Sequence, residues 1–145
     1  MPPKVVIVDD DANIRELFEN AFSASCQVFS AAEGQAALEL IRGDKIDLVF
    51  LDITMPGLSG LDVLRIIKQS GPEPVVWMLT GNEELEVITE AIGLGAAGYL
   101  TKPVNITKIR EIFNSVLKPD SGKSRGRPWV VKRQKGTERP GRSKQ

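Results

Sequence analysis

The sequence predicts an α/β fold, a doubly wound parallel sheet of five strands with helices on both faces. Short apolar runs alternate with helical patterns throughout residues 1–117. The runs at 4–8, 48–51 and 75–79 are continuously apolar rather than alternating, which is typical of strands that are covered on both faces. Five strand–helix units with short connections then indicate a parallel sheet, because each helix crosses over between two strands.

The apolar runs define the strands, and the spacing of apolar residues between them defines the helices. We expect the strands at 4–8, 27–31, 47–52, 74–79 and 98–101. The first helix is indicated by apolar residues at the i, i+3, i+4, i+7 and i+8 spacing of one helical face: Ile14, Leu17, Phe18, Ala21 and Phe22. Shorter stripes predict the second and third helices: Ala37, Leu40 and Ile41, then Val63, Leu64 and Ile67.

The last two helices differ in the strength of their patterns. The helix at about 83–93 is weakly patterned, because its apolar residues lie among four glutamates. The final helix is the clearest, and its stripe consists of Ile106, Ile109, Ile112, Phe113 and Val116.

The composition excludes several kinds of chemistry. The chain has 145 residues, 41% of them hydrophobic, which is enough for one domain with a core. It contains no histidine, which excludes imidazole bases, His-ligated zinc and a phosphohistidine formed on this chain. A single cysteine, Cys26, excludes an internal disulfide and is more typical of a buried core position than of a redox sensor. No apolar run approaches membrane-spanning length, so we expect a cytoplasmic protein with no membrane association.

The net charge of zero conceals an acidic part and a basic part. Residues 1–117 hold nine Lys and Arg against seventeen Asp and Glu, whereas residues 118–145 hold ten against two. The second part begins with a cluster of helix-breaking residues at 118–124 and has a single apolar island, at 129–131. That composition buries too little surface to order itself. We therefore expect one domain at 1–117 and a disordered basic tail or linker at 118–145.

Acidic residues follow two of the predicted strands. Asp9 and Asp10 follow the first strand, and Asp52 ends the third. Thr80 and Lys102 follow the fourth and fifth. In open parallel sheets ligands bind outside the carboxyl ends of the strands, so these side chains should meet at one rim. The simpler alternative is that acids at loop starts only cap helices, as we expect of Asp11.

Such a rim favours a particular chemistry. Carboxylates without His or Cys select a hard divalent cation, most plausibly Mg²⁺. The cation would reduce the repulsion between the acids and bridge to a phosphoryl oxygen. An aspartate can then attack phosphorus and carry an aspartyl-phosphate, with Lys102 paired to the same phosphoryl oxygens.

Residues 1–117 resemble the receiver domain of two-component response regulators over essentially their whole length. The resemblance is carried by four motifs that occur in order at the strand ends: Val8–Asp11, Leu51–Gly57 followed by Gly60, Leu79–Gly81, and Gly98–Pro103. It implies a flavodoxin-like sheet with the strand order 2-1-3-4-5.

The resemblance also implies a role for each site residue. Asp52 would be the phosphoacceptor, and Asp10 and Asp52 would bind Mg²⁺ directly together with the backbone carbonyl of Thr54. Asp9 would act mainly through water, and Lys102 would contact the phosphoryl oxygens. The remaining implied roles concern the switch and the backbone: Thr80 would bind the phosphoryl group, Tyr99 would be the aromatic switch, and the Lys102–Pro103 bond would be cis.

Three of these motif residues also have purely structural interpretations. Met55–Gly57 can be read as an ordinary turn. Gly60 is consistent with close packing alone, and Tyr99, taken by residue type, is typical of a core aromatic. The presence of Thr80 favours the switch role for Tyr99.

The basic tail contains a short motif of its own. Arg125, Gly126, Arg127 and Pro128 resemble the core of an AT-hook, in which glycine lets the backbone approach the minor groove and flanking arginines enter its negative potential. The family pattern continues with basic residues, whereas here Trp129–Val131 intervene. A solvated charged tail, or a linker to an effector domain outside this chain, are the alternatives.

The sequence therefore predicts a phosphorylation-controlled signalling switch, not an enzyme with a diffusible product. Its phosphoryl group would come from a histidine kinase or a histidine phosphotransfer protein, as in a phosphorelay. The competing prediction is a DNA-binding regulator that acts through the basic tail and is modulated by the receiver. A nucleotide-dependent enzyme is disfavoured, because the first strand leads into Asp9–Asn13 rather than a glycine-rich phosphate loop.

Overall fold

The computed structural model describes residues 2–70, 74–81 and 85–117. The chain divides into two compact units, Met1–Ile106 and Thr107–Gln145, which are described separately. The first unit contains the sheet and four helices. Residues 118–145, the predicted tail, lie outside the described residues, so the predicted boundary after residue 117 stays a prediction.

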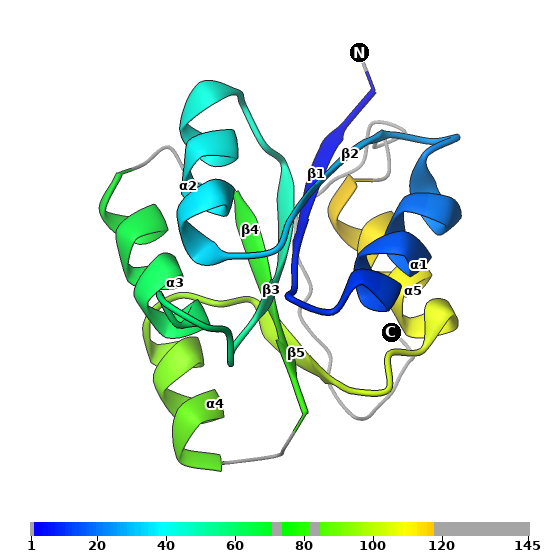
Figure 1. The fold of residues 1–145 in the computed structure, drawn as a ribbon. Coiled ribbons are helices and arrows are strands. Elements are labelled where there is room, and N and C mark those ends of the chain that lie inside the picture. Colours follow the sequence, from blue (N-terminus) through cyan, green and yellow to red (C-terminus); the bar gives the residue numbers. More distant parts are fainter. Residues whose placement is uncertain (1, 71–73, 82–84, 118–145) are drawn as a thin grey trace. The chain divides into compact units, whose positions relative to one another are not determined.

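Five parallel strands form one sheet in the order β2-β1-β3-β4-β5, which confirms the predicted flavodoxin-like topology. The strands are β1 (Lys4–Val8), β2 (Gln27–Ala31), β3 (Leu48–Asp52), β4 (Val75–Thr80) and β5 (Gly98–Thr101). Their bounds agree with the predicted ranges to within one residue. In Figure 1 the N-terminus enters β1 from above, so the carboxyl ends of these parallel strands point downward.

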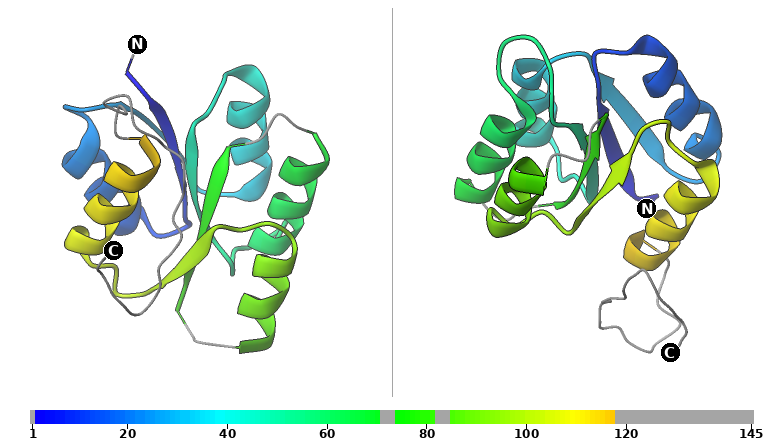
Figure 2. Two further views of the ribbon diagram at one scale, coloured as in Figure 1. Left: turned by 180° about the vertical axis from the view of Figure 1, so that it is seen from behind. Right: turned by 90° about the horizontal axis from the view of Figure 1, so that it is seen from below.

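The sheet is covered on both faces, as its continuous apolar strands predicted. The helices α2 (Gly34–Gly43), α3 (Gly60–Gln69) and α4 (Leu85–Gly93) cover one face, and α1 (Ala12–Phe22) lies on the other (Figures 1 and 2). Alternate residues of the strands, such as Val49 and Leu51, join the core under α2, α3 and α4. On the opposite face the ring of Phe18 lies 4.8 Å from that of Phe50, which ties α1 to β3.

Two helices that begin near the carboxyl ends of strands have well-formed N-terminal caps. Asp11 caps α1, since its Oδ1 accepts a hydrogen bond of 2.9 Å from the backbone N–H of Asn13. This confirms the predicted capping role. Ser59 and Asp62 form a reciprocal capping box at the start of α3. Both caps fix the direction in which the chain leaves the rim.

The helix α4 is attached by few buried side chains, in keeping with its weak pattern. Only Ile88 and Ala91 are buried within it, whereas Leu85 is 75% and Ile92 45% exposed. Arg65 of α3 forms an ion pair of 2.7 Å with Glu90 of α4.

The helix α5 (Ile106–Leu117) begins at the boundary between the two units and buries Ile109 and Ile112. Within the residues that the structure describes, no helix combines the length and the apolar character needed to cross a bilayer.

Candidate metal and phosphoacceptor site

Three carboxylates from two neighbouring strand ends meet at the rim. Asp9 and Asp10 follow β1 and Asp52 ends β3, the strand paired with β1. Each residue offers one carboxylate oxygen, and the three oxygens lie within 4.8 Å of one another. Asp9 is completely buried and Asp52 is 3% exposed, while Asp10 is exposed. The structure thus brings together the acids that the sequence placed at one edge, with one of them open to solvent.

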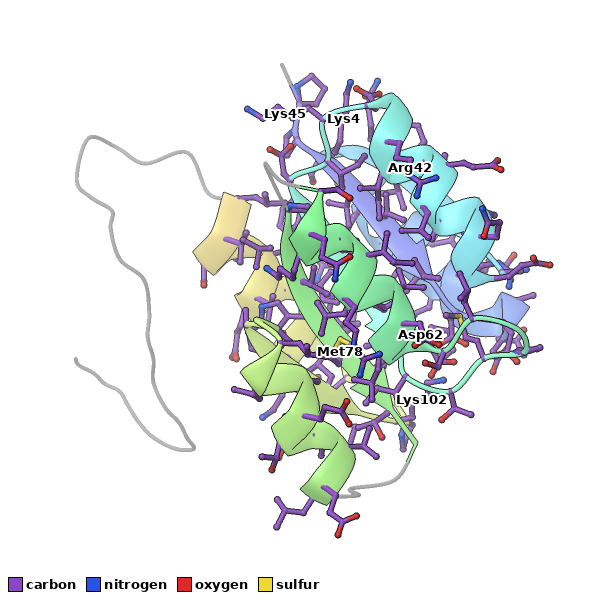
Figure 3. The ribbon with its side chains drawn as sticks, turned by 90° about the vertical axis from the view of Figure 1, so that its left-hand side faces the viewer. Lys4, Arg42, Lys45, Asp62, Met78 and Lys102 are labelled. Atoms are coloured by element: carbon purple, nitrogen blue, oxygen red, sulfur yellow. The ribbon has the colours of Figure 1, made fainter. Side chains whose placement is uncertain are left out.

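Lys102 lies between the two buried acids. Its Nζ is 2.9 Å from Oδ2 of Asp9 and 3.3 Å from Oδ2 of Asp52. The Lys102 residue follows β5, and its backbone N–H donates a hydrogen bond of 2.8 Å to the carbonyl of Thr80. The Lys102–Pro103 peptide bond is cis, as the resemblance implied. Figure 3 places Lys102 far from Lys4 and Lys45, which mark the opposite end of the sheet.

The pKa values of the two bridged groups shift in the direction that this burial and pairing require. Burial is the main cause that raises the pKa of Asp52 to about 6, and the charge of Asp9 adds to it. Lys102 and the N–H of Thr54 lower that pKa, but by less. Burial alone would lower the pKa of Lys102, yet Asp9 and Asp52 outweigh it and raise the pKa. Without a cation the site therefore holds more negative charge than Lys102 can balance.

The carboxylate of Asp9 is fixed in place while keeping one oxygen available. Its Oδ1 accepts a hydrogen bond of 2.9 Å from the N–H of Asp11. Its Oδ2 is buried and accepts no hydrogen bond from the described residues, because the nearby Lys102 ammonium is an ion-pair partner without hydrogen-bond alignment. A buried carboxylate oxygen left in this state is well suited to a cation.

The loop after Asp52 is held close to the acceptor strand. The N–H of Thr54 donates a hydrogen bond of 3.2 Å to Oδ1 of Asp52. Gly60 packs against the backbone here: a Cβ would lie 2.7 Å from Cα of Ile53 and would also collide with the Asp52 carbonyl. Close packing is therefore a real requirement at Gly60. Gly57 has a φ of 79°, which favours glycine in the Met55–Gly57 turn.

The two predicted switch residues lie in neighbouring strands. Thr80 ends β4 and is 7% exposed, and it is paired in register with Thr101 of β5. Tyr99 of β5 is 41% exposed, so its interpretation as a core aromatic is wrong. Cys26 is buried, as predicted. The AT-hook-like residues Arg125, Gly126, Arg127 and Pro128 lie outside the described residues.

Sequence reasoning missed one residue at the rim. Arg15 of α1 donates a hydrogen bond of 2.7 Å from Nη1 to the backbone carbonyl of Asp9. The available signal was a cation near the start of a helix that follows three aspartates. A helix N-terminus carries partial positive charge and usually disfavours a cation, so such a residue calls for an explanation.

Comparison with known proteins agrees with this geometry. The family model for the response regulator receiver domain matches residues 5–114. Sporulation initiation phosphotransferase F of Bacillus subtilis is 36% identical over 118 residues, which cover 81% of this chain and 95% of that protein. Response regulator MprA of Mycolicibacterium vanbaalenii is 32% identical over 126 residues, which cover 84% of this chain and 54% of MprA. The chain thus spans about half the length of MprA.

A solved structure shows the same arrangement. The chemotaxis protein CheY4 of Vibrio cholerae matches with a TM-score of 0.75 and 28% identity, over 81% of this chain and all of that one (100%). The chain belongs to the receiver domain family of two-component response regulators.

Proposed function

We propose that the chain is a signalling switch in which Asp52 accepts a phosphoryl group. The observation that carries the proposal is the buried Asp52 carboxylate, which shares a carboxylate cluster with Asp9 and Asp10 and lies 3.3 Å from the Lys102 ammonium. Asp52 is thus a nucleophile beside a fixed cation. The direct test is phosphorylation of the chain by a small-molecule phosphodonor such as acetyl phosphate.

The residues of the rim fit a Mg²⁺ ion. All side-chain donors in the cluster are carboxylate oxygens, which Mg²⁺ prefers, and Asp9 keeps a buried oxygen without a hydrogen bond. Asp10 and Asp52 would hold the ion directly with the carbonyl of Thr54, and Asp9 would act mainly through water. When bound, Mg²⁺ would supply positive charge that reduces repulsion between the acids and the incoming phosphoryl oxygens.

The proposed reaction transfers one phosphoryl group to this chain. A carboxylate oxygen of Asp52 forms the new O–P bond while the N–P bond of a donor phosphohistidine breaks. The imidazole of the donor keeps the electron pair and takes up a proton from solvent. Lys102 balances charge on the phosphoryl oxygens, and Thr80 donates its hydroxyl hydrogen to one of them.

The phosphoryl donor is a separate protein. Membership of the receiver family implies contact with a histidine kinase or a histidine phosphotransfer protein. The absence of histidine from this chain agrees with that division of roles. The product remains covalently bound to the chain, so its output is a change of surface and no small molecule is released.

The region from β4 to β5 is proposed as the surface that changes. Thr80 lies at the end of β4, next to α4 with its exposed Leu85 and Ile92, and Tyr99 is exposed on β5. Because α4 has two buried side chains and an exposed ion pair to α3, a small free-energy difference can shift it. Phosphorylation would bias an equilibrium that already exists in this region.

We expect the Thr80→Ala variant to accept phosphate while transmitting the change poorly, because the phosphoryl oxygen loses its contact with β4. The measurement is NMR of both forms, in which wild-type phosphorylation shifts the signals of residues 80–105. Thr89→Ala, which alters an exposed threonine of α4, serves as the matched control and should retain those shifts. Wild-type shifts that spare residues 80–105 would refute this part of the proposal.

DNA binding by residues 118–145 is the second candidate function, and the concentration of ten Lys and Arg there is the observation that favours it. Such binding should be salt-sensitive, because the cations displace counterions from DNA phosphates. If Arg125 and Arg127 enter a minor groove, replacing both should erase any preference for A/T-rich over G/C-rich duplex. Scattered Lys→Ala changes should weaken both equally.

A chain ending at Leu117 provides the control. It should still be phosphorylated on Asp52 and should lose the DNA affinity. Equal affinity of the full and shortened chains for DNA at moderate salt would assign the tail to a linker or solubilising role, and the receiver proposal would stand without it.

A further inference from the structure

Arg15 occupies a position that its own helix disfavours. It is the fourth residue of α1, and its side chain turns back to place Nη1 2.7 Å from the carbonyl oxygen of Asp9. The N-terminal turn of a helix carries partial positive charge, which repels a guanidinium. The contact therefore depends on something that offsets this repulsion, and the three aspartates Asp9, Asp10 and Asp11 provide it.

The carbonyl that Arg15 binds belongs to the peptide joining Asp9 to Asp10. A peptide unit is planar, so fixing its oxygen also fixes the direction in which the backbone enters Asp10. Asp9 is held on its other side as well, since its N–H donates to the carbonyl of Ala31 at 3.1 Å. The orientation of this one peptide is thus set from both sides.

Asp10 needs this support because its own side chain is not held. Within the described part of the chain, its carboxylate takes part in no recorded hydrogen bond or ion pair, and the residue is exposed. Even so, one of its oxygens lies within 4.8 Å of those of Asp9 and Asp52. The backbone at Asp10, and not a side-chain partner, directs that oxygen toward the cluster.

We propose that Arg15 is a positioning residue for the cation site: through the Asp9 carbonyl it holds the Asp9–Asp10 peptide so that the Asp10 carboxylate faces Asp52. The inference rests on the proposed Mg²⁺ site and adds a residue to it. Arg15 touches neither the ion nor the phosphoryl group in this account, and acts only through Asp10.

Charge and position predict opposite effects when Arg15 is neutralised. If the guanidinium acted only as a nearby positive charge, its removal would tighten the binding of Mg²⁺, because one source of repulsion disappears. If it acts by holding the peptide, its removal weakens binding, since Asp10 no longer keeps its direction. Outer partners of metal ligands typically change affinity by about 10-fold or more. The sign of the change therefore separates the two roles.

The experiment is a titration of the full chain with MgCl₂, followed by calorimetry, for the wild type, Arg15→Met and Arg15→Lys. Methionine keeps an apolar stem but has neither the charge nor the donor. We expect Arg15→Met to raise the dissociation constant about 10-fold, and Arg15→Lys, which keeps charge and a donor, to restore most of the affinity. Arg42→Met removes the same charge from an exposed site in the last turn of α2 and should leave the dissociation constant unchanged.

Circular dichroism and melting in chelator verify that each variant is folded, and Arg15→Ala serves as a second neutral variant. An unchanged or lower dissociation constant in a folded neutral variant would overturn the positioning role while leaving the proposed function intact. Failure of Arg15→Lys to recover any affinity would also count against it. A wild-type chain that binds no Mg²⁺ would overturn the proposed site, and this inference with it.

Discussion

The Asp52→Asn variant is expected to take up no phosphoryl group from acetyl phosphate, under conditions in which the wild-type chain is modified in a Mg²⁺-dependent way. An amide lacks the anionic oxygen that attacks phosphorus, so the loss should be complete and not partial. The fold should survive, because the change removes one charge from a cluster that is already too acidic. Intact-mass measurement of both proteins after incubation with the phosphodonor reports the result.

The control for this variant is Asp44→Asn. Asp44 is exposed and forms an ion pair of 2.6 Å with Lys4, which marks the end of the sheet opposite Lys102 (Figure 3). It should be modified to the wild-type level. Full modification of Asp52→Asn would contradict the assignment of the acceptor.

The second large effect concerns the stability of the metal-free chain. The pKa of Asp52 is raised from its ordinary value of 3.8 to about 6, chiefly by burial and then by the charge of Asp9. The folded state therefore binds this proton more tightly than the unfolded state, and the free energy of unfolding falls as pH rises through that window. Two pKa units correspond to about 3 kcal/mol as an upper limit.

Asp52→Asn removes the group that loses stability. In chelator at about pH 7 the variant should unfold at higher urea concentration than the wild type, and the difference should vanish near pH 4, where the wild-type carboxyl is protonated. Asp44→Asn should not gain stability with rising pH, because Lys4 lowers the pKa of Asp44 and makes its charged form favourable. A wild type that is the more stable protein at neutral pH in chelator would contradict the proposed strain.

Mg²⁺ should reverse the order of stability. Binding to the folded state alone adds about 2.7 kcal/mol to the free energy of unfolding at a hundred times the dissociation constant. The wild type should gain this stabilisation and Asp52→Asn should lose most of it, since the variant lacks one of the ligands. A wild-type melting temperature indifferent to Mg²⁺ would count against the cation site.

Much of this architecture could be predicted because the sequence patterns are local. Continuous apolar runs identified β1, β3 and β4 as strands covered on both faces, and helical spacing identified α1 and α3. The end of β4 was placed one residue early. Thr80 is paired with Thr101 of β5, a contact between strands that no property of residue 80 alone reveals.

The site was predictable to the extent that it follows from strand ends. Parallel strands bring their carboxyl ends to one edge, so the convergence of Asp9, Asp10 and Asp52 could be expected from sequence position. The exposure of Tyr99 could not, because it depends on how much of β5, an edge strand, its neighbours cover. The contact of Arg15 with a backbone carbonyl is equally hidden, since it involves a flexible side chain and a group that every residue has.

The most direct measurement locates the phosphoryl group on the chain. The wild-type protein is incubated with acetyl phosphate and Mg²⁺, treated with borohydride to convert any aspartyl-phosphate to homoserine, digested, and mapped by mass spectrometry. The account predicts homoserine at residue 52 alone, and none when a chelator replaces Mg²⁺. Homoserine at another aspartate, or an unmodified Asp52 in a folded chain with Mg²⁺ bound, would contradict it.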